Sequence, residues 1–246
     1  MFINNINPDI LKIGPFTIRF YGIVYALGYL LITYLLSKKK IKNLTKEKAL
    51  DITTYGLIFG VIGARIFHVL SDYSLYENNL LDVFAIWKGG LGFMGGLAGA
   101  LVFVYYYCKA HKIELMQVLD VMAAPLALVI GFGRIANYIN SEHLGYATNL
   151  PWCVVYEKFD MICRHPAQIY EAISMFLLCA VLFFLQKKWH KKGAMFWSFI
   201  LGYGIARFTT DFFRTQDVYI VGFAHTQWIS AVMIILGGYY LVKVKK

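Results

Sequence analysis

Charged residues are scarce in this sequence. Asp, Glu, Lys and Arg together make up 15% of the 246 residues, whereas about 25% is usual in soluble domains. Hydrophobic residues make up 59%. This composition excludes an ordinary soluble domain and predicts a protein that is embedded in a membrane.

The sequence also lacks the residue clusters that hold metals. It has four cysteines and six histidines, and these form no Cys-x-x-Cys or His/Cys motif. We therefore expect neither a metal nor a cofactor. Cys153 and Cys163 lie in the same polar segment, where a disulfide is one alternative and two free thiols are the other.

Acidic residues are few, and the basic residues are unevenly placed. The chain has 24 Lys and Arg against 14 Asp and Glu, which leaves a formal net charge of +10. Most lysines follow every second apolar run, in residues 38–48, 109–112, 187–192 and 243–246. The positive-inside rule places such loops in the cytoplasm. The basic balance therefore predicts contact with anionic membrane lipids and no nucleic acid.

Apolar runs long enough to cross a bilayer, about 20 residues each, recur along the chain. They predict an all-α, polytopic membrane protein of about seven transmembrane helices, at residues 17–37, 49–70, 91–108, 115–134, 168–185, 194–213 and 226–242. An odd number of spans and lysine-rich inner loops place the N-terminus outside and the C-terminus in the cytoplasm. We expect a single membrane-embedded domain, 1–246. A small periplasmic cap at 139–167 separates spans 4 and 5, and its stretch WCVVYEKFDMIC predicts a hairpin.

The arginines are distributed differently from the lysines. All six lie outside the lysine-rich loops, near the predicted outer face of the membrane: Arg19, Arg65, Arg134, Arg164, Arg207 and Arg214. An arginine in a span costs a few kcal/mol unless it is paired or faces water. Separate interhelical ion pairs are one interpretation, but six arginines at one level favour a shared anionic ligand.

Helical spacing groups several polar residues on common faces. RIANYIN places Arg134 beside Asn137, and RFTTDFFR places Arg207, Asp211 and Arg214 on one face. These groupings predict an outer cavity for an anionic amphiphile. An enzyme that acts on phospholipid headgroups and an anion transporter both fit. The absence of the internal repeat that transporters usually show favours the enzyme.

Several motifs resemble those of the bacterial prolipoprotein diacylglyceryl transferase family. GRIANYINSEHLG is similar to its pattern G-R-x-G-N-F-x-N-x-E-x-x-G, with Ala136 in place of a glycine. RHPAQIYE resembles its R-H-P-[ST]-Q-x-Y-E, with Ala167 as a departure. GYGIARFTTDFFR resembles its Y-G-x-x-R-[FI]-x-x-E-x-x-R, with Asp211 where glutamate is usual.

The resemblance implies a seven-span enzyme of the bacterial inner membrane. Such an enzyme transfers the diacylglyceryl group of phosphatidylglycerol to the lipobox cysteine of a preprolipoprotein signal peptide, which forms a thioether and releases glycerol 1-phosphate. Arg134 and Arg207 are the expected catalytic residues. The expected substrate-binding residues are Tyr21, Arg65, Gly95, Gly96, Asn137, Asn140, Glu142, Gly145, Gln168, Asp211 and Arg214. Close packing of helices is the alternative role for Gly95 and Gly96, and interfacial anchoring is the alternative for Tyr21.

One departure from the family leaves the proton acceptor open. The family usually has a histidine where this chain has Met94, and a thioether does not accept a proton from a thiol. The arginines alone could activate the thiol, or another histidine could substitute, namely His68, His143 or His165. A third alternative is an anionic phospholipid-binding or transport protein on the same scaffold, without transferase activity.

Overall fold

The computed structural model describes residues 2–13, 16–77, 79–216 and 218–245. The chain divides into two compact units. The first unit comprises residues 1–32 and 119–246, and the second comprises residues 33–118. The expectation of a single domain remains a prediction.

Long helices dominate the described part of the chain and confirm an all-α, polytopic membrane protein. They are α1 (Phe20–Lys38), α2 (Lys46–Ser71), α3 (Phe93–Ala110), α4 (Leu115–Ile139), α5 (Ala167–Gln186), α6 (Ala194–Thr210) and α7 (His225–Lys245). Among the described residues, six of these helices are long and apolar enough to cross a membrane. The remaining one, α6, has 17 residues and continues directly into the short helix η4 (Asp211–Phe213).

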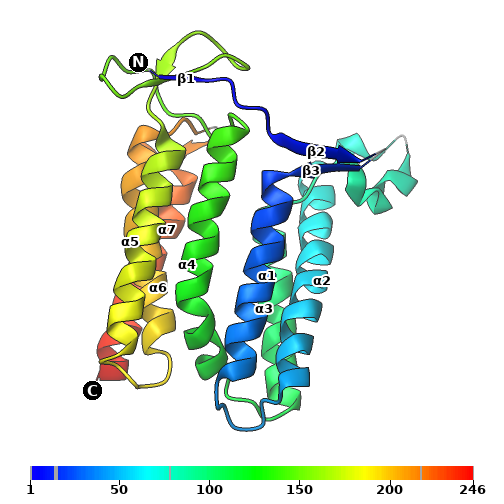
Figure 1. Ribbon diagram of the computed structural model, residues 1–246, viewed down its shortest axis with the longest axis vertical. Helices are drawn as coiled ribbons and strands as arrows, with labels where there is room; N and C mark the ends of the chain where they lie inside the picture. Colours follow the sequence, from blue (N-terminus) through cyan, green and yellow to red (C-terminus); the bar gives the residue numbers. More distant parts are fainter. Residues whose placement is uncertain (1, 14–15, 78, 217, 246) are drawn as a thin grey trace. The chain divides into compact units, whose positions relative to one another are not determined.

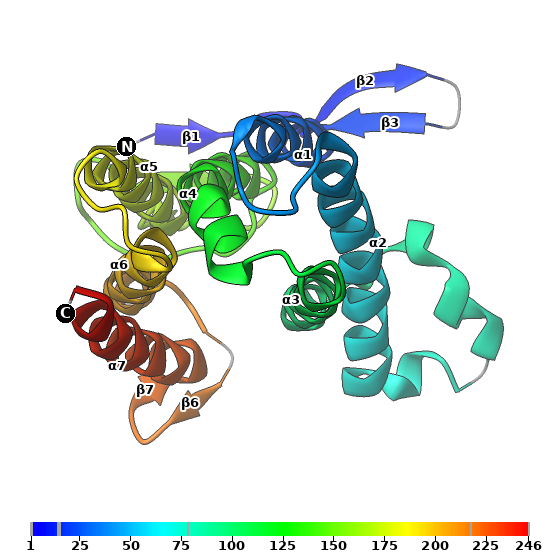
Figure 2. The same ribbon diagram turned by 90° about the horizontal axis from the view of Figure 1, so that it is seen from below.

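Glycines control how α2 and α3 pack in the second unit, where the two helices lie side by side (Figure 2). A Cβ atom on Gly63 would lie 3.1 Å from the Cα of Gly99 and would overlap the carbonyl oxygen of Gly95. Such contacts bring the two backbones closer than larger side chains allow. Between the helices the chain forms η1 (Tyr73–Leu75), η2 (Leu80–Phe84) and η3 (Ile86–Lys88).

Helices α4 to α7 form the core of the first unit, with α4 beside α5, and α6 next to both α5 and α7 (Figures 1 and 2). Small residues of α4, such as Ala123 and Ala127, are buried against Met175, Cys179 and Leu182 of α5. In a membrane such small residues stabilise a bundle because they let the helices approach closely and gain van der Waals contact. This packing brings the C-terminal ends of α4 and α6 to the N-terminal end of α5, and the polar residues lie there.

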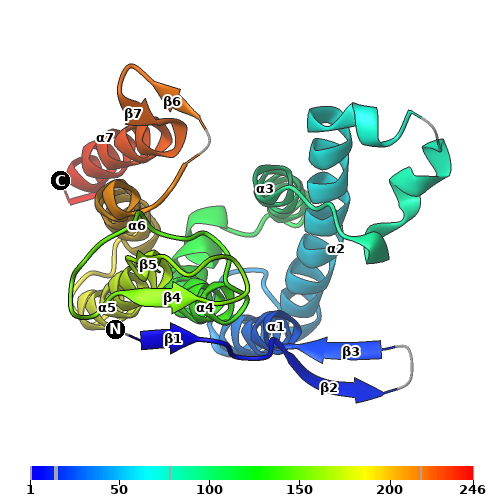
Figure 3. The ribbon, with the colours of Figure 1, turned by 90° about the horizontal axis from the view of Figure 1, so that it is seen from above.

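A small sheet covers the ends of α4 and α5 (Figure 3). Strands β4 (Val154–Tyr156) and β5 (Cys163–Arg164) pair antiparallel, which confirms the predicted hairpin. Cys153 and Cys163 form a disulfide, so the alternative of two free thiols was wrong. The sequence did not indicate that β1 (Phe2–Asn4) pairs in parallel with β4.

Two further hairpins belong to the first unit. Strands β2 (Asp9–Ile13) and β3 (Phe16–Arg19) form the first, directly before α1. Strands β6 (Tyr219–Ile220) and β7 (Phe223–Ala224) form the second, directly before α7. The short strands that precede these helices are a feature that the apolar periodicity of the sequence did not predict.

Candidate active site

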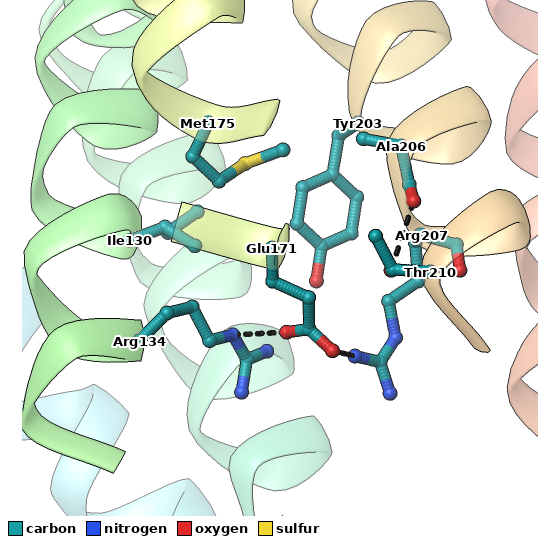
Figure 4. A pocket seen from close by; sticks show the side chains of 8 residues that line it. All are labelled: Ile130, Arg134, Glu171, Met175, Tyr203, Ala206, Arg207 and Thr210. Carbon is teal, nitrogen blue, oxygen red and sulfur yellow. Dashed lines mark hydrogen bonds and ion pairs between the residues drawn. The ribbon is translucent and has the colours of Figure 1, made fainter. Parts of the chain in front are cut away.

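Glu171 lies at the centre of a cluster of arginines in the first unit. It is on the first turns of α5, where Pro166 begins the helix, and its side chain is 6% exposed. Arg134 of α4 contacts its Oε2 through Nε at 2.5 Å, and Arg207 of α6 donates from Nη1 to its Oε1. Both arginines point toward the carboxylate from opposite sides (Figure 4). Two residues 73 positions apart in the sequence thus share one carboxylate.

Arg214 completes the cluster from the segment that follows η4. Its Nη1 lies 3.7 Å from Oε1 of Glu171, and its Nη2 lies 2.6 Å from Nδ1 of His143. Burial, with Arg207 next in effect, lowers the pKa of Arg214 to about 10, so the guanidinium stays charged at neutral pH. Among the described residues, its Nε is a buried donor without a hydrogen-bond partner. Such a donor suits an anionic ligand.

Asp211 holds Arg207 from one helical turn further along the chain. Its Oδ1 lies 3.0 Å from Nη2 of Arg207. Gln216 donates to the same oxygen at 2.8 Å, and Thr226 donates to Oδ2 at 2.6 Å. Because the aspartate is buried and its oxygens accept bonds from three directions, Arg207 has little freedom to turn away from the site.

A second network extends from Arg134 toward the cap. Its Nη1 donates to Oδ1 of Asn137 at 3.1 Å, and Nδ2 of Asn137 donates to Oε2 of Glu142 at 2.9 Å. Tyr21 donates its hydroxyl to the same oxygen of Glu142. Asn140 donates to Oε1 of Glu142 at 3.2 Å. The contact of Arg134 with Asn137 that helical spacing predicted is therefore observed, and Glu142 is the common acceptor of Tyr21, Asn137 and Asn140.

Gln168 and Gly145 fix the backbone of this segment. Gln168 is buried, donates to the carbonyl of Glu142 and accepts from Tyr156 at 3.0 Å. A Cβ atom on Gly145 would lie 2.7 Å from the carbonyl oxygen of Phe213, and as close to Cβ of His165. Only glycine fits here, because the chain segments at His165 and at Phe213 both approach the backbone of Gly145.

Arg134, Arg207 and Glu171 line a small cavity. Its volume is about 10 Å³, and its other walls come from Ile130, Met175, Tyr203, Ala206 and Thr210 (Figure 4). That volume corresponds to about one water molecule. A lipid phosphate therefore enters only if side chains move.

The balance of charge in the cluster favours an anion. Three guanidiniums, those of Arg134, Arg207 and Arg214, face two carboxylates, those of Glu171 and Asp211, so one positive charge remains. Inside a protein this charge is less screened than in water. The site is therefore suited to a group with one negative charge, such as a phosphodiester.

Comparison with known proteins agrees with this geometry. A family model described as prolipoprotein diacylglyceryl transferase matches residues 8–243. The chain belongs to this family. A relative from Idiomarina loihiensis is 36% identical over 242 residues, which cover 95% of this chain and 91% of the relative. Relatives from Rickettsia africae and Neisseria meningitidis are 34% and 31% identical, and at least 93% of each chain is covered. All three are named phosphatidylglycerol–prolipoprotein diacylglyceryl transferase.

Three of the predicted binding residues of this family member lie in the second unit. Arg65 directs its guanidinium at backbone carbonyls of residues 82–90, including Val83 at 2.8 Å and Gly90 at 2.9 Å. Gly95 and Gly96 lie on the face of α3 that packs against α2. Each therefore has a structural role within this unit, and headgroup binding by these residues remains a prediction.

The histidines differ in their surroundings. His143 is next to Arg214, whereas His165 lies 3.3 Å from the hydroxyl of Tyr170 and packs against Phe213. His68, in the second unit, pairs with Asp72 at 3.0 Å. Of the histidines in the first unit, His143 is the one that contacts the arginine cluster among the described residues.

Sequence reasoning missed two important members of the site. Glu171 was recognised as part of the RHPAQIYE motif but not as a site residue, although a single carboxylate at a helix start was a usable signal. Tyr203 lies one turn before Arg207 on α6, and its hydroxyl points into the same space (Figure 4). Tyr203 belongs to the GYGIARFTTDFFR stretch that resembles the family motif, and this was the signal that could have identified it.

Proposed function

We propose that this chain transfers the diacylglyceryl group of phosphatidylglycerol to the lipobox cysteine of a preprolipoprotein, and that the arginine cluster is where this occurs. The observation that carries the proposal is the convergence of Arg134 and Arg207 on one buried carboxylate. Guanidiniums held in this way are aligned before the lipid arrives. Such preorganisation is the main source of electrostatic catalysis.

The reaction needs positive charge at the phosphate. The thiol sulfur attacks the glycerol carbon that bears the phosphate, and the electron pair of the broken C–O bond moves to a phosphate oxygen. Arg134 and Arg207 would neutralise this growing charge. Arg214, whose Nε is a buried donor without a partner, would add a third contact. Loss of one such donor typically slows a reaction about 10²–10³-fold.

The network around Glu142 would orient the headgroup and the arginines. Tyr21, Asn137 and Asn140 all donate to its carboxylate, so they hold one another in a defined arrangement. Asn137 also accepts from Arg134, which links the network to the phosphate site. Gln168 and Gly145 support the backbone beneath it.

The nucleophile comes from the second substrate. A cysteine thiol has a pKa near 8.5 and reacts as the thiolate. Positive charge from the cluster favours the thiolate and draws it toward the glycerol carbon. We place the site on the periplasmic side of the inner membrane, with the C-terminus cytoplasmic, because lysines gather in the loops after α1, α3 and α5 and in the last turn of α7.

A direct assay tests the proposal. Purified protein in nanodiscs that contain phosphatidylglycerol is incubated with a lipobox peptide, and mass spectrometry measures the diacylglyceryl adduct. A peptide with serine in place of the cysteine is the control. Headgroup binding without any adduct would support the alternative of a lipid-binding or transport protein on this scaffold.

The arginine assignment is tested in the same assay. Arg207→Lys keeps one positive charge but loses the planar fork that bridges Glu171 and Asp211. We expect kcat to fall about 10²–10³-fold. Arg19→Lys is the matched control, because Arg19 pairs with Asp9 on an exposed hairpin. Equal turnover of Arg207→Lys and the unmodified protein would contradict the assignment.

A further inference from the structure

Glu171 occupies the point where the guanidiniums converge. Arg134 and Arg207 contact its two oxygens, and Arg214 lies 3.7 Å from one of them. A phosphate that uses both catalytic arginines needs the same donors. Because the cavity holds about 10 Å³, the carboxylate and a lipid phosphate do not fit together in this arrangement.

We propose that the lipid phosphate displaces the Glu171 carboxylate from the arginines and that the freed carboxylate is the base that accepts the proton of the substrate thiol. This inference rests on the proposed function and adds a catalytic residue to it. In the free protein Glu171 occupies the position of the phosphate between the arginines. In the protein with bound lipid it is the proton acceptor.

The proposed step is balanced in atoms and charge. The S–H proton of the cysteine moves to a carboxylate oxygen of Glu171, and the sulfur electron pair forms the C–S bond. The C–O bond to the phosphate breaks, and its electron pair remains on the phosphate oxygen of glycerol 1-phosphate. The phosphate gains one negative charge as Glu171 loses one, so the net charge of the site is unchanged. The proton leaves later to the phosphate or to water.

Exchange of partners makes the carboxylate available only when the lipid is in place. In the free protein Arg134 and Arg207 occupy the two oxygens of Glu171. A phosphodiester that takes over these donors leaves the oxygens free to accept the thiol proton. This order prevents deprotonation of a thiol without a reaction partner.

The charged and titratable groups around Glu171 are compatible with this exchange. From α4 it faces Arg134, and from α6 it faces Arg207 and Tyr203. Arg214 and His143 approach from the segments after η4 and α4, and Asp211 acts through Arg207. The Tyr203 hydroxyl points into the cavity and offers the displaced carboxylate a hydrogen-bond donor (Figure 4).

His143 is a poorer candidate for the base. A guanidinium has no lone pair to share, so Arg214 donates to Nδ1 of His143 and that nitrogen is the acceptor. The ring proton is therefore on Nε2, and the basic nitrogen is already engaged. Met94, which replaces the usual histidine of the family, has no basic group. Glu171 is the carboxylate that the phosphate itself would free.

The first experiment compares Glu171→Gln with the unmodified protein over a range of pH. Glutamine keeps the shape and removes the base, so we expect kcat to fall at least 100-fold at pH 7. Hydroxide should then replace the lost base, and the rate should rise about tenfold per pH unit up to the pKa of the thiol near 8.5. Glu157→Gln, on the exposed turn of the cap, is the matched control and should behave like the unmodified protein.

The second experiment measures binding of dihexanoyl phosphatidylglycerol by calorimetry in detergent. Because glutamine competes less well than a carboxylate for the arginines, Glu171→Gln should bind this lipid at least as tightly as the unmodified protein. A residue that only positioned the arginines would give the opposite result, namely weaker binding, and its rate would not recover at high pH. Either of those results would overturn the proposal, as would an unchanged kcat.

The controls distinguish failure of the proposed function from failure of the role proposed for Glu171. If the unmodified protein and Glu157→Gln both give no adduct, the proposed function fails before Glu171 is tested. If Glu171→Gln does not fold, the variant Glu171→Asp tests the role of Glu171 as the base. Its shorter carboxylate keeps the base, so its slower rate should have the pH dependence of the unmodified protein, and a tenfold rise per pH unit would contradict the role as base.

Discussion

Asp211 holds Arg207 by an ion pair within one turn of the chain, with Oδ1 3.0 Å from Nη2. The other terminal nitrogen of Arg207, Nη1, contacts Glu171 on α5. Arg207 therefore joins a local pair, which its helix provides, to a distant one, which the bundle provides. The local pair determines where the guanidinium points, and the distant pair brings it beside Arg134.

Asp211→Asn tests this orientation. The charge that aligns Arg207 is lost while the shape is kept, so we expect kcat to fall about 10- to 100-fold, as misplacement of a catalytic group does. The lipobox-peptide assay measures it. Asp211→Glu, which introduces the residue usual in the family, should keep most of the activity. The control Asp9→Asn changes an exposed pair with Arg19 and should leave kcat within about twofold.

Gly145→Ala tests the crossing of chain segments beneath Glu142. The added methyl group would lie 2.7 Å from the carbonyl oxygen of Phe213 and would push against His165. We expect the free energy of unfolding to fall by about 1–3 kcal/mol, as overpacking usually costs, with a loss of activity as the segment shifts. Thermal unfolding in detergent measures the first effect.

A glycine in open space provides the control for that prediction. Gly238 lies on α7, and a Cβ atom there has no neighbour within 4 Å. Gly238→Ala should be neutral or stabilise the helix by up to about 1 kcal/mol. Equal stability losses in both variants would show that close contact at Gly145 is not the cause.

Removal of the disulfide between Cys153 and Cys163 should destabilise the cap. The bond closes a loop with a sequence separation of 10, and its loss is expected to cost about 2–3 kcal/mol. Since the cap holds Gly145 through Arg164, activity should also fall at higher temperature. Differential scanning fluorimetry with and without dithiothreitol measures the change, and a variant with both cysteines replaced by serine should be insensitive to the reductant.

His143 makes stability depend on pH in the acidic range. Loss of hydration around the ring lowers its pKa to about 4 from the usual 6.5, and Arg214 and Arg134 add to the effect. Below about pH 6.5 the unfolded chain binds a proton at His143 and the folded chain does not. The contribution of His143 to the free energy of unfolding is therefore full above about pH 6.5 and falls as the pH drops toward 4. Because the residue is more than a third exposed, solvent screening keeps this contribution below about 1 kcal/mol.

Comparison of His143→Gln with the unmodified protein isolates that contribution. Both proteins are unfolded by heat at pH 7.5 and at pH 5, where other groups titrate alike. The Tm of the variant should fall less between the two pH values, by roughly 1–4 °C. An equal fall in both would show that His143 does not titrate in this range.

Local patterns in the sequence predicted much of the protein. The apolar runs predicted the helices because a membrane-crossing backbone must satisfy its hydrogen bonds internally. The four-residue spacing of Arg207 and Asp211 predicted their pairing, because such residues share a helix face. The stretch between Cys153 and Cys163 predicted a hairpin, although the disulfide remained one of two alternatives.

The tertiary structure alone decided which distant groups meet. Nothing near Glu171 in the sequence shows that it faces Arg134 and Arg207, because that contact depends on how α4, α5 and α6 pack. The pairing of β1 with β4 joins residues about 150 positions apart and was equally hidden. The sequence thus determined the helices and the types of charge they carry, through local spacing and apolar length. The packing of small residues between the helices determined that one carboxylate stands among three guanidiniums.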